Sequence, residues 1–502
     1  MTRSDVLVVG AGPTGLVLAL WLTKLGAKVR IVDKTATAGT TSRALAVHAR
    51  TLELYRQLDL ADAVIAKGHK VPAVNLWVGG GKKATISFEN VGADITAYPF
   101  LHIFPQDEHE KLLISRLAYM GITVERSVEC VGFEDKGDRI VARLRRPDKS
   151  EEVFEASWLA GCDGAGSMAR KALGVGFPGG DYNHIFYVAD VDASGPPMDG
   201  ELHVDLDQAD FLAVFPLAGQ GRARLVGAIR DVKHPELIQF EDISPRAIEN
   251  LKISVGKVNW FSHYHVHHRV AENFRKGRVF LLGDAAHIHS PAGGQGMNTG
   301  IGDAINLAWK LRSVMAGLAP ETLLNSYEEE RIAFAQRLVH TTDRLFTLAS
   351  SESRFAGLLR KHVVPIAFPW LAKSEGFRKW LFRNISQLSL SYRDCPLNSG
   401  CAGRVRGGDR LPWIASVDNH RSLADMRWQI HIYGEAPAEL DRWRRQYDLP
   451  MHVFGWRGEY QKAGLARNAL YLMRPDGYVA LASPVATSEA LARYLTARRI
   501  RF

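Results

Sequence analysis

The first 33 residues of the chain carry the pattern that most constrains its fold. An apolar run, Asp5–Val9, leads into the glycine-rich segment Gly10–Gly15 (GAGPTG). An apolar helical pattern follows as far as Gly26, and a second apolar run, Lys28–Val32, ends at Asp33. Strand, GxGxxG, helix, strand and an acidic residue about 20 positions further on make up a dinucleotide-binding unit. The pattern predicts an α/β fold with a nucleotide at the carboxyl ends of parallel strands.

Each glycine of the GxGxxG segment has its own task. Gly10 permits a tight turn, Gly12 lets a pyrophosphate approach the backbone, and Gly15 lets helix and strand pack closely. The N-terminus of the helix offers free N–H groups and a partial positive charge to the phosphates. Asp33 would accept hydrogen bonds from a ribose diol. The pattern serves FAD and NAD alike, so it leaves the nucleotide open.

A second glycine-rich segment, Gly283–Leu311, follows the apolar run Arg278–Leu282. Asp284 stands at the carboxyl end of this predicted strand, where open α/β sheets bind ligands. Three glycines then precede a helix, which the apolar periodicity places from about residue 296 through Lys310. A helix N-terminus whose amides no side chain obstructs favours an anion or a polarised carbonyl over a metal cation.

Histidines gather near this segment. His287 and His289 lie two residues apart, and residues 263–268 read HYHVHH. On a strand, residues 263, 265 and 267 would share one face. No further ligand stands at a useful local spacing, so the sequence predicts no metal site. An acid/base role for His287 or His289 stays open as the lesser alternative, because neither has a partner that the sequence reveals.

Composition excludes several classes of protein. The net charge is +9, but no run of five like charges suggests a nucleic-acid-binding tail. The four cysteines form no CxxC pair, which argues against a zinc site and fits a reducing cytoplasm. No stretch is apolar enough to span a bilayer. We therefore expect a cytoplasmic protein of about three domains with no nucleic-acid partner and no membrane span.

A third segment, Gly161–Ser167 (GCDGAGS), lies between the other two, and Arg170 follows it. In this order the three segments resemble the signatures of the class A flavoprotein aromatic hydroxylases, the group of para-hydroxybenzoate and phenol hydroxylases. Within the segment GDAAHIHSPAGGQGMN, residues 287–298 look closer to hydroxylases of polycyclic polyketides and varied phenols than to simple phenol hydroxylases. Further segments resemble the family between residue 1 and about residue 345: Ser42–Leu54, Gln106 with Glu110, Tyr327, and Glu330 with Arg331.

The resemblance implies a Rossmann-like FAD-binding domain at 1–180 and 270–395, including a helical extension. An antiparallel β-sheet substrate domain at 181–269 would be interleaved with it, joined by strands from about 72–100. Alternating apolar runs between Gly, Pro and Asp turns support antiparallel strands at 181–269. Residues 400–502 resemble the thioredoxin-like domain of larger members but lack CxxC. Within them, Asp476-Gly477 predicts a hairpin.

The resemblance also implies an activity. FAD would be bound, NADPH or NADH and O2 would be consumed, and a phenolic or polycyclic aromatic substrate would be hydroxylated through a flavin C4a-hydroperoxide. The chain would act as a monomer or homodimer. Alternatives on the same fold are Baeyer–Villiger or epoxidising oxygen transfer, an FAD-dependent dehydrogenase or reductase, and a non-catalytic flavin-binding module.

Roles for single residues follow from the resemblance. The pyrophosphate would lie at Gly10, Gly12, Pro13, Thr14 and Gly15. The adenosine would lie at Asp33 and Lys34, with the backbone of Cys130 near the adenine. Asp163 would serve both nucleotides, and the phosphate and ribityl region would meet Arg43, Gln106 and Asp284. The flavin ring would meet Pro291 at its C4a edge and, at its N1–C2=O side, the backbone of Gly294, Gly296, Met297 and Asn298. The substrate base stays open among His48, His184, Tyr187 and His203. Of these, His48 is the tentative catalytic candidate beside Pro291.

Overall fold

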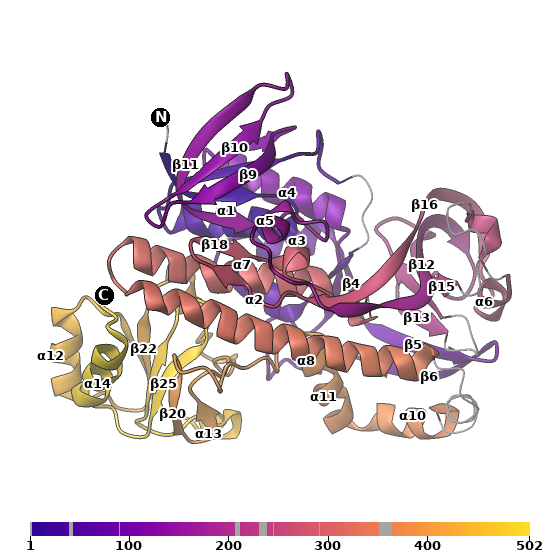
Figure 1. Ribbon diagram of the computed structural model, residues 1–502. Coiled ribbons are helices and arrows are strands. Elements are labelled where there is room, and N and C mark those ends of the chain that lie inside the picture. The colour runs from indigo at the N-terminus through magenta and orange to yellow at the C-terminus, as the bar shows by residue number, and fades with distance from the viewer. Residues whose placement is uncertain are drawn as a thin grey trace.

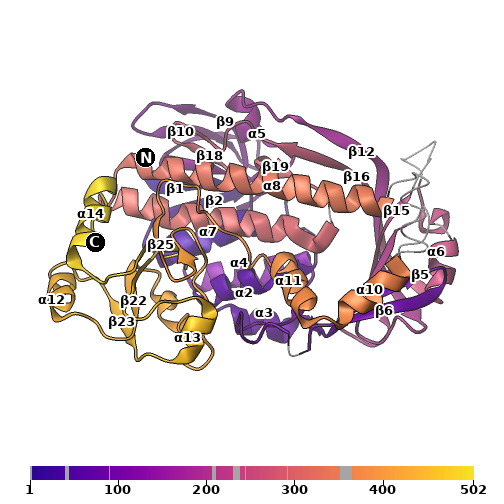
Figure 2. The same cartoon turned by 90° about the horizontal axis from the view of Figure 1, so that it is seen from below.

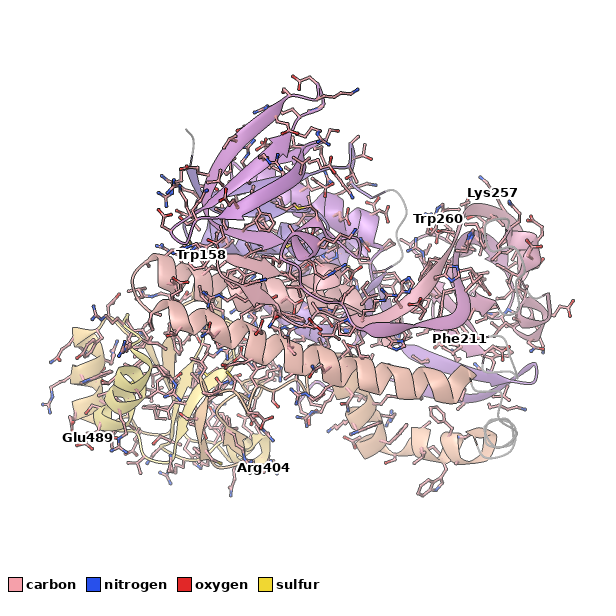
Figure 3. All side chains as sticks on the ribbon, in the orientation of Figure 1. Trp158, Phe211, Lys257, Trp260, Arg404 and Glu489 are labelled. Carbon is pink, nitrogen blue, oxygen red and sulfur yellow. The ribbon has the colours of Figure 1, made fainter. Side chains whose placement is uncertain are left out.

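The computed structural model describes residues 3–39, 44–89, 91–205, 211–229, 238–243, 245–290, 292–350 and 364–502. Its described strands form three large sheets and a small one. The first sheet lies at the top of Figure 1, the second at the right and the third, nearest the C-terminus, at the lower left. Trp158 lies in the first sheet, Trp260 in the second, and Arg404 and Glu489 near the third (Figure 3).

The first sheet is the parallel sheet that the N-terminal pattern predicts. Strand β1 (Arg3–Val9) lies between β2 (Val29–Asp33) and β11 (Glu151–Gly161), and both are parallel to it. Outside them, β8 (Val124–Arg126) is parallel to β2, and β18 (Val279–Leu281) is parallel to β11. Its remaining strands are antiparallel to their neighbours: β9 (Glu129–Asp135), β10 (Ile140–Arg145) and β17 (Arg275–Lys276).

Helices cover the first sheet and bury the middle of its central strand. Val6, Leu7 and Val8 have no exposed surface, as expected for a strand covered on both faces. Helix α1 (Pro13–Lys24) packs between β1 and the long helix α7 (Gln295–Met315). The shorter helices of this part are α2 (Ala49–Arg56), α3 (Ala61–Lys67), α4 (Gln106–Tyr119) and α5 (Met168–Ala172).

The second sheet runs in the order β19-β16-β12-β15-β14-β13-β5-β6 and is antiparallel except where β13 meets β5. Hydrophobic side chains of one face pack against helix α6 (Pro245–Asn250) and its flanking residues. The sheet takes strands from three stretches of the chain: β5 (Ala73–Val78) and β6 (Gly81–Ser87); β12 (Gly179–Ser194), β13 (Leu202–Asp205), β14 (Leu212–Pro216), β15 (Arg222–Ile229) and β16 (Ser254–Val270); and β19 (His287–Ile288).

Two long helices connect the parts. Helix α7 and helix α8 (Asn325–Ser350) run side by side between the first sheet and the third (Figure 2). The predicted end of α7 near Lys310 is too early, because the helix continues to Met315. Lys310 has no exposed surface, so this cation does not mark a solvent-exposed helix end. Two further helices follow α8 in the sequence, α10 (Val364–Lys373) and α11 (Glu375–Ile385).

The third sheet is mixed and has the order β21-β20-β25-β24-β22-β23. Strands β22 and β23 are parallel across helix α12, whereas β24 and β25 form an antiparallel hairpin that turns at Asp476-Gly477. The bounds are β20 (Ser399–Ala402), β21 (Val405–Arg406), β22 (Gln429–Tyr433), α12 (Ala438–Gln446), β23 (Met451–Phe454), α13 (Gly458–Ala463), β24 (Leu470–Met473), β25 (Val479–Ser483) and α14 (Ser488–Arg498).

A small antiparallel sheet completes the fold, with β7 (Leu101–Ile103) between β3 (Ala46–Val47) and β4 (His69–Val71). All four cysteines are free. Among the described residues, no helix is long and apolar enough to cross a membrane.

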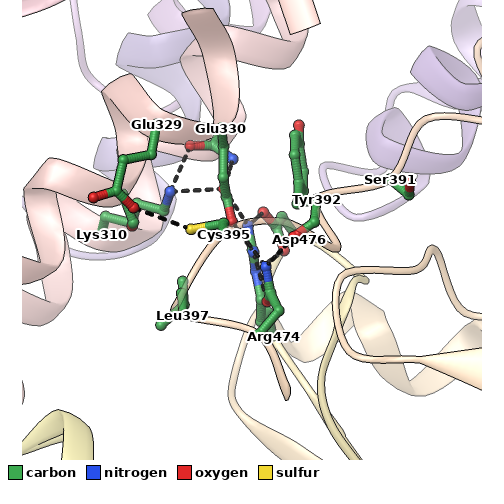
Figure 4. A network of polar contacts seen from close by, with 12 residues as sticks. Lys310, Glu329, Glu330, Ser391, Tyr392, Cys395, Leu397, Arg474 and Asp476 are labelled. Carbon is green, nitrogen blue, oxygen red and sulfur yellow. Dashed lines mark hydrogen bonds and ion pairs between the residues drawn. The ribbon is translucent and has the colours of Figure 1, made fainter. Parts of the chain in front are cut away.

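A buried charge network joins the third sheet to α7 and α8 (Figure 4). Lys310 Nζ lies 2.8 Å from Glu330 Oε2, and Arg474 Nη1 lies 2.5 Å from Glu330 Oε1. The second carboxylate, that of Asp476, lies 2.6 Å from Arg474 Nη2. Two cations thus face two carboxylates, which is the balance that buried charges require.

A second buried ion cluster lies where α2 meets the C-terminal part of the chain. The carboxylate of Glu53 accepts hydrogen bonds from Arg50 on the same helix and from Arg410. Burial alone would raise the pKa of Glu53, but the charge of Arg410 and its hydrogen bonds outweigh burial and lower this pKa to about 2.

This lowered pKa predicts how stability depends on pH. Glu53 stabilises the fold above its unfolded pKa of about 4.5, and the contribution is lost as the pH falls towards 2. We expect Glu53→Gln to lower the free energy of unfolding at pH 7 by on the order of 3 kcal/mol, because it leaves two buried arginines without their anion. Urea unfolding of the apoprotein between pH 7 and pH 3 measures both effects. The variant should lose less stability than the wild type on acidification, and equal losses would contradict the assignment.

Candidate active site

The carboxyl ends of four parallel strands meet at one edge of the first sheet. Gly10 N donates to Val32 O at 2.8 Å, and Cys162 N donates to Val9 O at 2.8 Å. Leu282 N donates to Gly161 O at 3.0 Å. Strand pairing therefore brings together the three glycine-containing segments that the sequence singles out, although they are far apart along the chain.

The glycines of the first segment test whether a nucleotide fits here. At Gly10 an added Cβ would lie 2.3 Å from Cys162 O, and at Gly15 it would lie 2.0 Å from Gly10 O. Both positions are therefore fixed by protein packing. At Gly12 no atom of the described protein lies within 4 Å of the same position. The open side of Gly12 leaves room for a phosphate against the backbone.

Helix α1 begins at this open side. Pro13 is its first residue, Gly12 gives no side-chain cap, and the first turn holds no acidic residue. An uncapped N-terminus of a buried helix is a site for an anion. Thr14 packs inward, because an added Cβ at Gly283 or Gly300 would lie 2.7 or 2.3 Å from its Oγ1.

The predicted adenosine residues lie at the end of β2. Asp33 Oδ2 accepts from Ala11 N at 2.6 Å, and Oδ1 accepts from Thr35 N at 2.8 Å. Arg126 Nη1 lies 3.6 Å from Asp33 Oδ1, and its Nη2 is buried without a partner among the described residues. Sequence reasoning missed Arg126, since an arginine on a short edge strand carries no motif.

The surface beside Asp33 is open. Lys34 is exposed there, and it lines a groove together with Thr35, Ser127 and Glu129. Cys130 follows on β9, where burial raises the pKa of its thiol to about 12. The thiol is therefore neutral and unreactive, so only the backbone of Cys130 is suited to contact a ligand.

Two aspartates face the same edge from other segments. Asp284 is the exposed residue between the buried Gly283 and Ala285. Asp163 Oδ2 accepts from Ala169 N at 3.0 Å, whereas its Oδ1 is buried without a partner in the described part of the chain. Arg170 holds the two segments together, because its guanidinium donates to Ala285 O and Ala165 O. Asp163 Oδ1 is thus an acceptor that a bound ligand could use.

The N-terminus of helix α7 is a second place where an anion could bind. Its N-cap Gly294 has φ +63°, and an added Cβ there would lie 2.9 Å from Ala46 Cβ, so β3 packs directly on this turn. The first amides of the helix, at Gln295, Gly296 and Met297, have no acceptor within the helix. These amides are available to a negatively charged group.

Asn298 fixes that turn through its side chain. Its Oδ1 accepts from His48 N at 2.9 Å and from Thr51 Oγ1 at 2.7 Å. Its Nδ2 donates to Ala46 O and Gly294 O. The sequence predicts only a backbone role for Asn298, and the structure adds a link between α7 and α2.

Two histidines at this turn are neutral: His48 is buried, and His289 is half-buried with its Nε2 atom inaccessible. Burial lowers the pKa of His48 and of His289 to about 4 each, although a backbone hydrogen bond opposes the shift. His48 Nε2 lies 3.2 Å from Gly293 O, and His289 Nδ1 lies 2.8 Å from Ser290 O. Each of these nitrogens must carry the proton, because a carbonyl only accepts. His48 Nδ1 and His289 Nε2 remain as buried acceptors without a described partner.

His287 has the partner that the sequence does not reveal. Its Nε2 lies 2.7 Å from Asp303 Oδ2, and Arg331 Nε donates to Asp303 Oδ1 at 2.6 Å. Gly283 N also donates to Asp303 Oδ2, at 3.0 Å. His287 therefore helps to hold the turn that carries Asp284. Asp303 is the one charged residue between Gly296 and Trp309, and that is the signal that could have indicated a buried partner.

The other predicted site residues have weaker links to this edge of the sheet or lie outside the described residues. Gln106 begins α4 and donates to Glu110, which also accepts from Gly39 N. Arg43 and Pro291, like the side chain of His184, lie outside the described residues. Tyr187 packs in the cluster beneath α6, on the opposite face of the second sheet from the Leu45–Val47 segment.

His203 lies on the same covered face, near Asp199 and Glu201. Ligand atoms of these three residues lie within 4.8 Å of one another. However, Trp77 Nε1 donates to His203 Nδ1 at 3.0 Å, so Nε2 carries the proton and donates it to Asp199 at 2.9 Å. Both ring nitrogens of His203 are thus engaged, and neither is free for a cation or a substrate.

Because Gly12 is open whereas Gly10 and Gly15 are crowded, a substitution at Gly12 tests directly whether a phosphate binds there. We expect Gly12→Ala to fold with an unchanged melting temperature, because nothing crowds the added methyl group and φ is −76°. It should weaken FAD binding about tenfold or more, which is at least about 1.4 kcal/mol. Flavin fluorescence during titration of the apoprotein measures the affinity. The control is Gly455→Ala, at an equally open glycine of the C-terminal part. Equal FAD affinities in the two variants would contradict a phosphate site at Gly12.

Comparison with known proteins agrees with this geometry. Residues 3–342 match the family model described as FAD binding domain. The chain is 34% identical to 6-methylpretetramide 4-monooxygenase of Streptomyces rimosus, over 95% of this chain and 90% of that protein. It is 31% identical to rifampicin monooxygenase of Rhodococcus hoagii, over 95% of each chain. The solved structure of the anhydrotetracycline hydroxylase OxyS from Streptomyces rimosus matches with a TM-score of 0.78 and 28% identity, over 98% of each chain. The chain therefore belongs to the FAD-binding family of flavoprotein monooxygenases.

Proposed function

We propose that this monooxygenase hydroxylates a polycyclic, phenolic aromatic substrate, with NADPH or NADH as the electron donor. The observation that carries the proposal is the meeting of three elements: the N-terminus of α7, the Leu45–His48 segment and the face of the second sheet opposite α6. The relatives named for 6-methylpretetramide and anhydrotetracycline support a polycyclic substrate.

The wall for an aromatic ring would be the face of the second sheet that turns away from α6. Leu202 and Phe215 on this face pack with Leu45 and Ile103 in one hydrophobic cluster. A second cluster on the same face joins Phe186 to Val266 and Tyr264. Ala46 packs on Gly294, so the first cluster adjoins the turn before α7. Apolar walls with few polar groups are typical of sites for aromatic ligands.

The described residues fit FAD, and we propose how they hold it. Gly10, Gly12, Pro13, Thr14 and Gly15 would bind the pyrophosphate, while Asp33, Lys34 and the backbone of Cys130 would bind the adenosine. Asp163, Gln106 and Asp284 would meet the ribityl and phosphate groups. Arg43 and Pro291, outside the described residues, keep the roles that the resemblance implies. When bound, FAD supplies the redox and oxygen chemistry of the reaction.

The protein's own contribution would be electrostatic. The free first-turn amides of α7, at Gln295, Gly296 and Met297, would face the N1–C2=O side of the flavin ring and stabilise negative charge there. His48 would offer its neutral Nδ1 to the hydroxyl of a bound phenol and orient the ring by accepting a hydrogen bond. A pKa of about 4 keeps His48 an acceptor at neutral pH.

We also propose the division into domains. The FAD-binding domain would span 1–180 and 270–395, the substrate domain 181–269 with strands from 72–100, and a thioredoxin-like domain 400–502. The parallel pairing of β5 with β13 supports the second assignment. The third is supported by a β22-α12-β23 unit followed by the β24–β25 hairpin and α14, in the strand order β25-β24-β22-β23.

The activity can be tested with labelled oxygen. Purified protein should consume NADPH faster when a polycyclic phenol is present, and the product should gain one hydroxyl oxygen from O2. Mass spectrometry of the product distinguishes the alternatives, because ring-inserted oxygen indicates Baeyer–Villiger chemistry and an epoxide indicates epoxidation. NADPH oxidation without an oxygenated product from any aromatic compound tested would instead favour a dehydrogenase or reductase.

Asp284 gives a test at a single residue. We expect Asp284→Ala to be purified with little or no flavin, because an exposed carboxylate at this strand end would hold the ribityl chain. Visible absorbance of the purified protein measures the bound flavin. Glu272→Ala, an exposed acidic residue elsewhere on the same part of the chain, should retain it. Full flavin content in Asp284→Ala would refute the ribityl assignment.

A further inference from the structure

The turn between β24 and β25, Arg474–Gly477, contacts three helices of the N-terminal part of the chain. Asp476 O accepts from Arg50 Nη2 on α2 at 2.7 Å, and Asp476 Oδ2 accepts from Trp309 Nε1 on α7 at 3.0 Å. Arg474 pairs with Glu330 on α8 (Figure 4). Arg474 has no exposed surface and Asp476 is 2% exposed. The turn that the Asp-Gly pair predicts is thus a buried junction and not a surface loop.

Helix α2 is held at both ends by different parts of the chain. At its N-terminal end, His48 N and Thr51 Oγ1 donate to Asn298. Arg50, also near this end, reaches Asp476 O with its side chain, and beyond the last residue of the helix Gln57 Nε2 donates to Leu423 O at 2.7 Å and Pro475 O at 2.9 Å. The N-terminal end of this short helix therefore lies at the proposed flavin site, and hydrogen bonds from both ends hold it to the turn.

Helix α7 makes the matching connection. Asn298 is in its first turns, and Trp309 is eleven residues later, roughly 16 Å along the helix axis at 1.5 Å per residue. A continuous helix is stiff over this length, so the position of Trp309 restricts the position of the first turn. The contacts form a closed ring: the turn to α2, α2 to Asn298, and α7 back to the turn.

The backbone of the turn is packed tightly against this ring. Gly477 has φ +77°, and an added Cβ would lie 3.2 Å from Leu423 Cδ1 and 3.8 Å from Arg50 Nη2. A left-handed conformation beside these neighbours accounts for glycine at this position. Asp476 can therefore present its carbonyl to α2 and its carboxylate to α7 at the same time.

We propose that the Arg474–Gly477 turn is a positioning element for the flavin site. By holding α2 and α7 together, it fixes the distance between His48 and the first-turn amides of α7, two groups that face the proposed ligand. This inference rests on the proposed function of that site. It gives the C-terminal part of the chain a role in cofactor binding, although the turn itself touches neither cofactor nor substrate.

Two mild substitutions test the ring. Trp309→Phe removes the indole N–H that reaches Asp476 and keeps an aromatic ring. Gln57→Leu removes both bonds of the amide, and it also removes an Oε1 that is buried without a partner among the described residues. We expect each variant to raise the dissociation constant of the apoprotein for FAD by roughly 5- to 20-fold and to shift the absorption spectrum of bound flavin. The double variant should fall short of the product of the two, because both substitutions open the same ring.

Two control variants separate positioning from a general loss of stability. Trp428→Phe makes a similar cavity next to Trp309, since the two rings pack 5.5 Å apart, but it removes no contact of the turn. Tyr471→Phe removes a buried hydroxyl that bonds within the C-terminal part, to Ala402 O at 3.0 Å. Both controls should bind FAD within about twofold of the wild type. Equal FAD affinities in the test and control variants, at an equal loss of melting temperature, would overturn the proposal.

Hydrogen–deuterium exchange of the apoprotein gives a readout that does not depend on FAD or activity. Amides of residues 49–52 and 295–299 should exchange faster in both test variants and at the wild-type rate in both controls. Unchanged exchange at these amides would refute the ring itself. If the wild type failed to bind FAD while exchange still responded, the proposed function would be wrong and the ring would stand.

Discussion

One buried carboxylate, that of Asp303, holds together the parts on which the site depends. It accepts from the backbone of Gly283, from His287 and from Arg331. Gly283 ends the first sheet, His287 begins the strand that joins the second, and Arg331 belongs to α8. Burial alone would raise the pKa of Asp303, but the positive charge of Arg331 and the contact with His287 lower it. The ionised carboxylate is therefore stable where the two sheets meet, and Asp284 owes its exposed position to that anchor.

Local sequence patterns predict the strands, turns and helices that carry the site. Hydrogen-bond partners that are far apart in the sequence can be identified only from the structure. The glycine at position 15 follows from the pattern, because its reason is contact with Gly10 within one strand–helix unit, whereas Gly10 also packs against Cys162 from a distant segment. The partners of His287 and Lys310 do not follow from it. Glu330 reaches Lys310 only when α7 and α8 pack side by side, and Asp303 reaches His287 only when α7 packs against the segment that follows β18. A single charged residue in a long uncharged stretch of a helix, such as Asp303, signals that a partner exists but does not identify it.

The fully buried ion pairs of α7 lie beyond its first turn. Two carboxylates balance two cations on α7, α8 and the Arg474–Gly477 turn, and Asp303 of α7 pairs with Arg331. Near the first turn of α7 lie instead the neutral imidazoles of His48 and His289. A fixed cation there would compete with the helix amides for a negative ligand group, and a fixed anion would repel it. Neutral acceptors leave the helix N-terminus as the main source of local field.

The C-terminal part of the chain has no CxxC motif, and its proposed role is to position the flavin site. A redox role would need paired thiols, but Cys395 is buried with its pKa raised to about 12, and Cys401 lies elsewhere on an exposed strand. What this part supplies is a rigid turn whose two polar groups reach two helices. Hydrogen bonds of this kind impose direction as well as distance, which hydrophobic packing of α2 alone would not. The orientation of His48 relative to Met297 is therefore set from residues more than 150 positions away in the sequence.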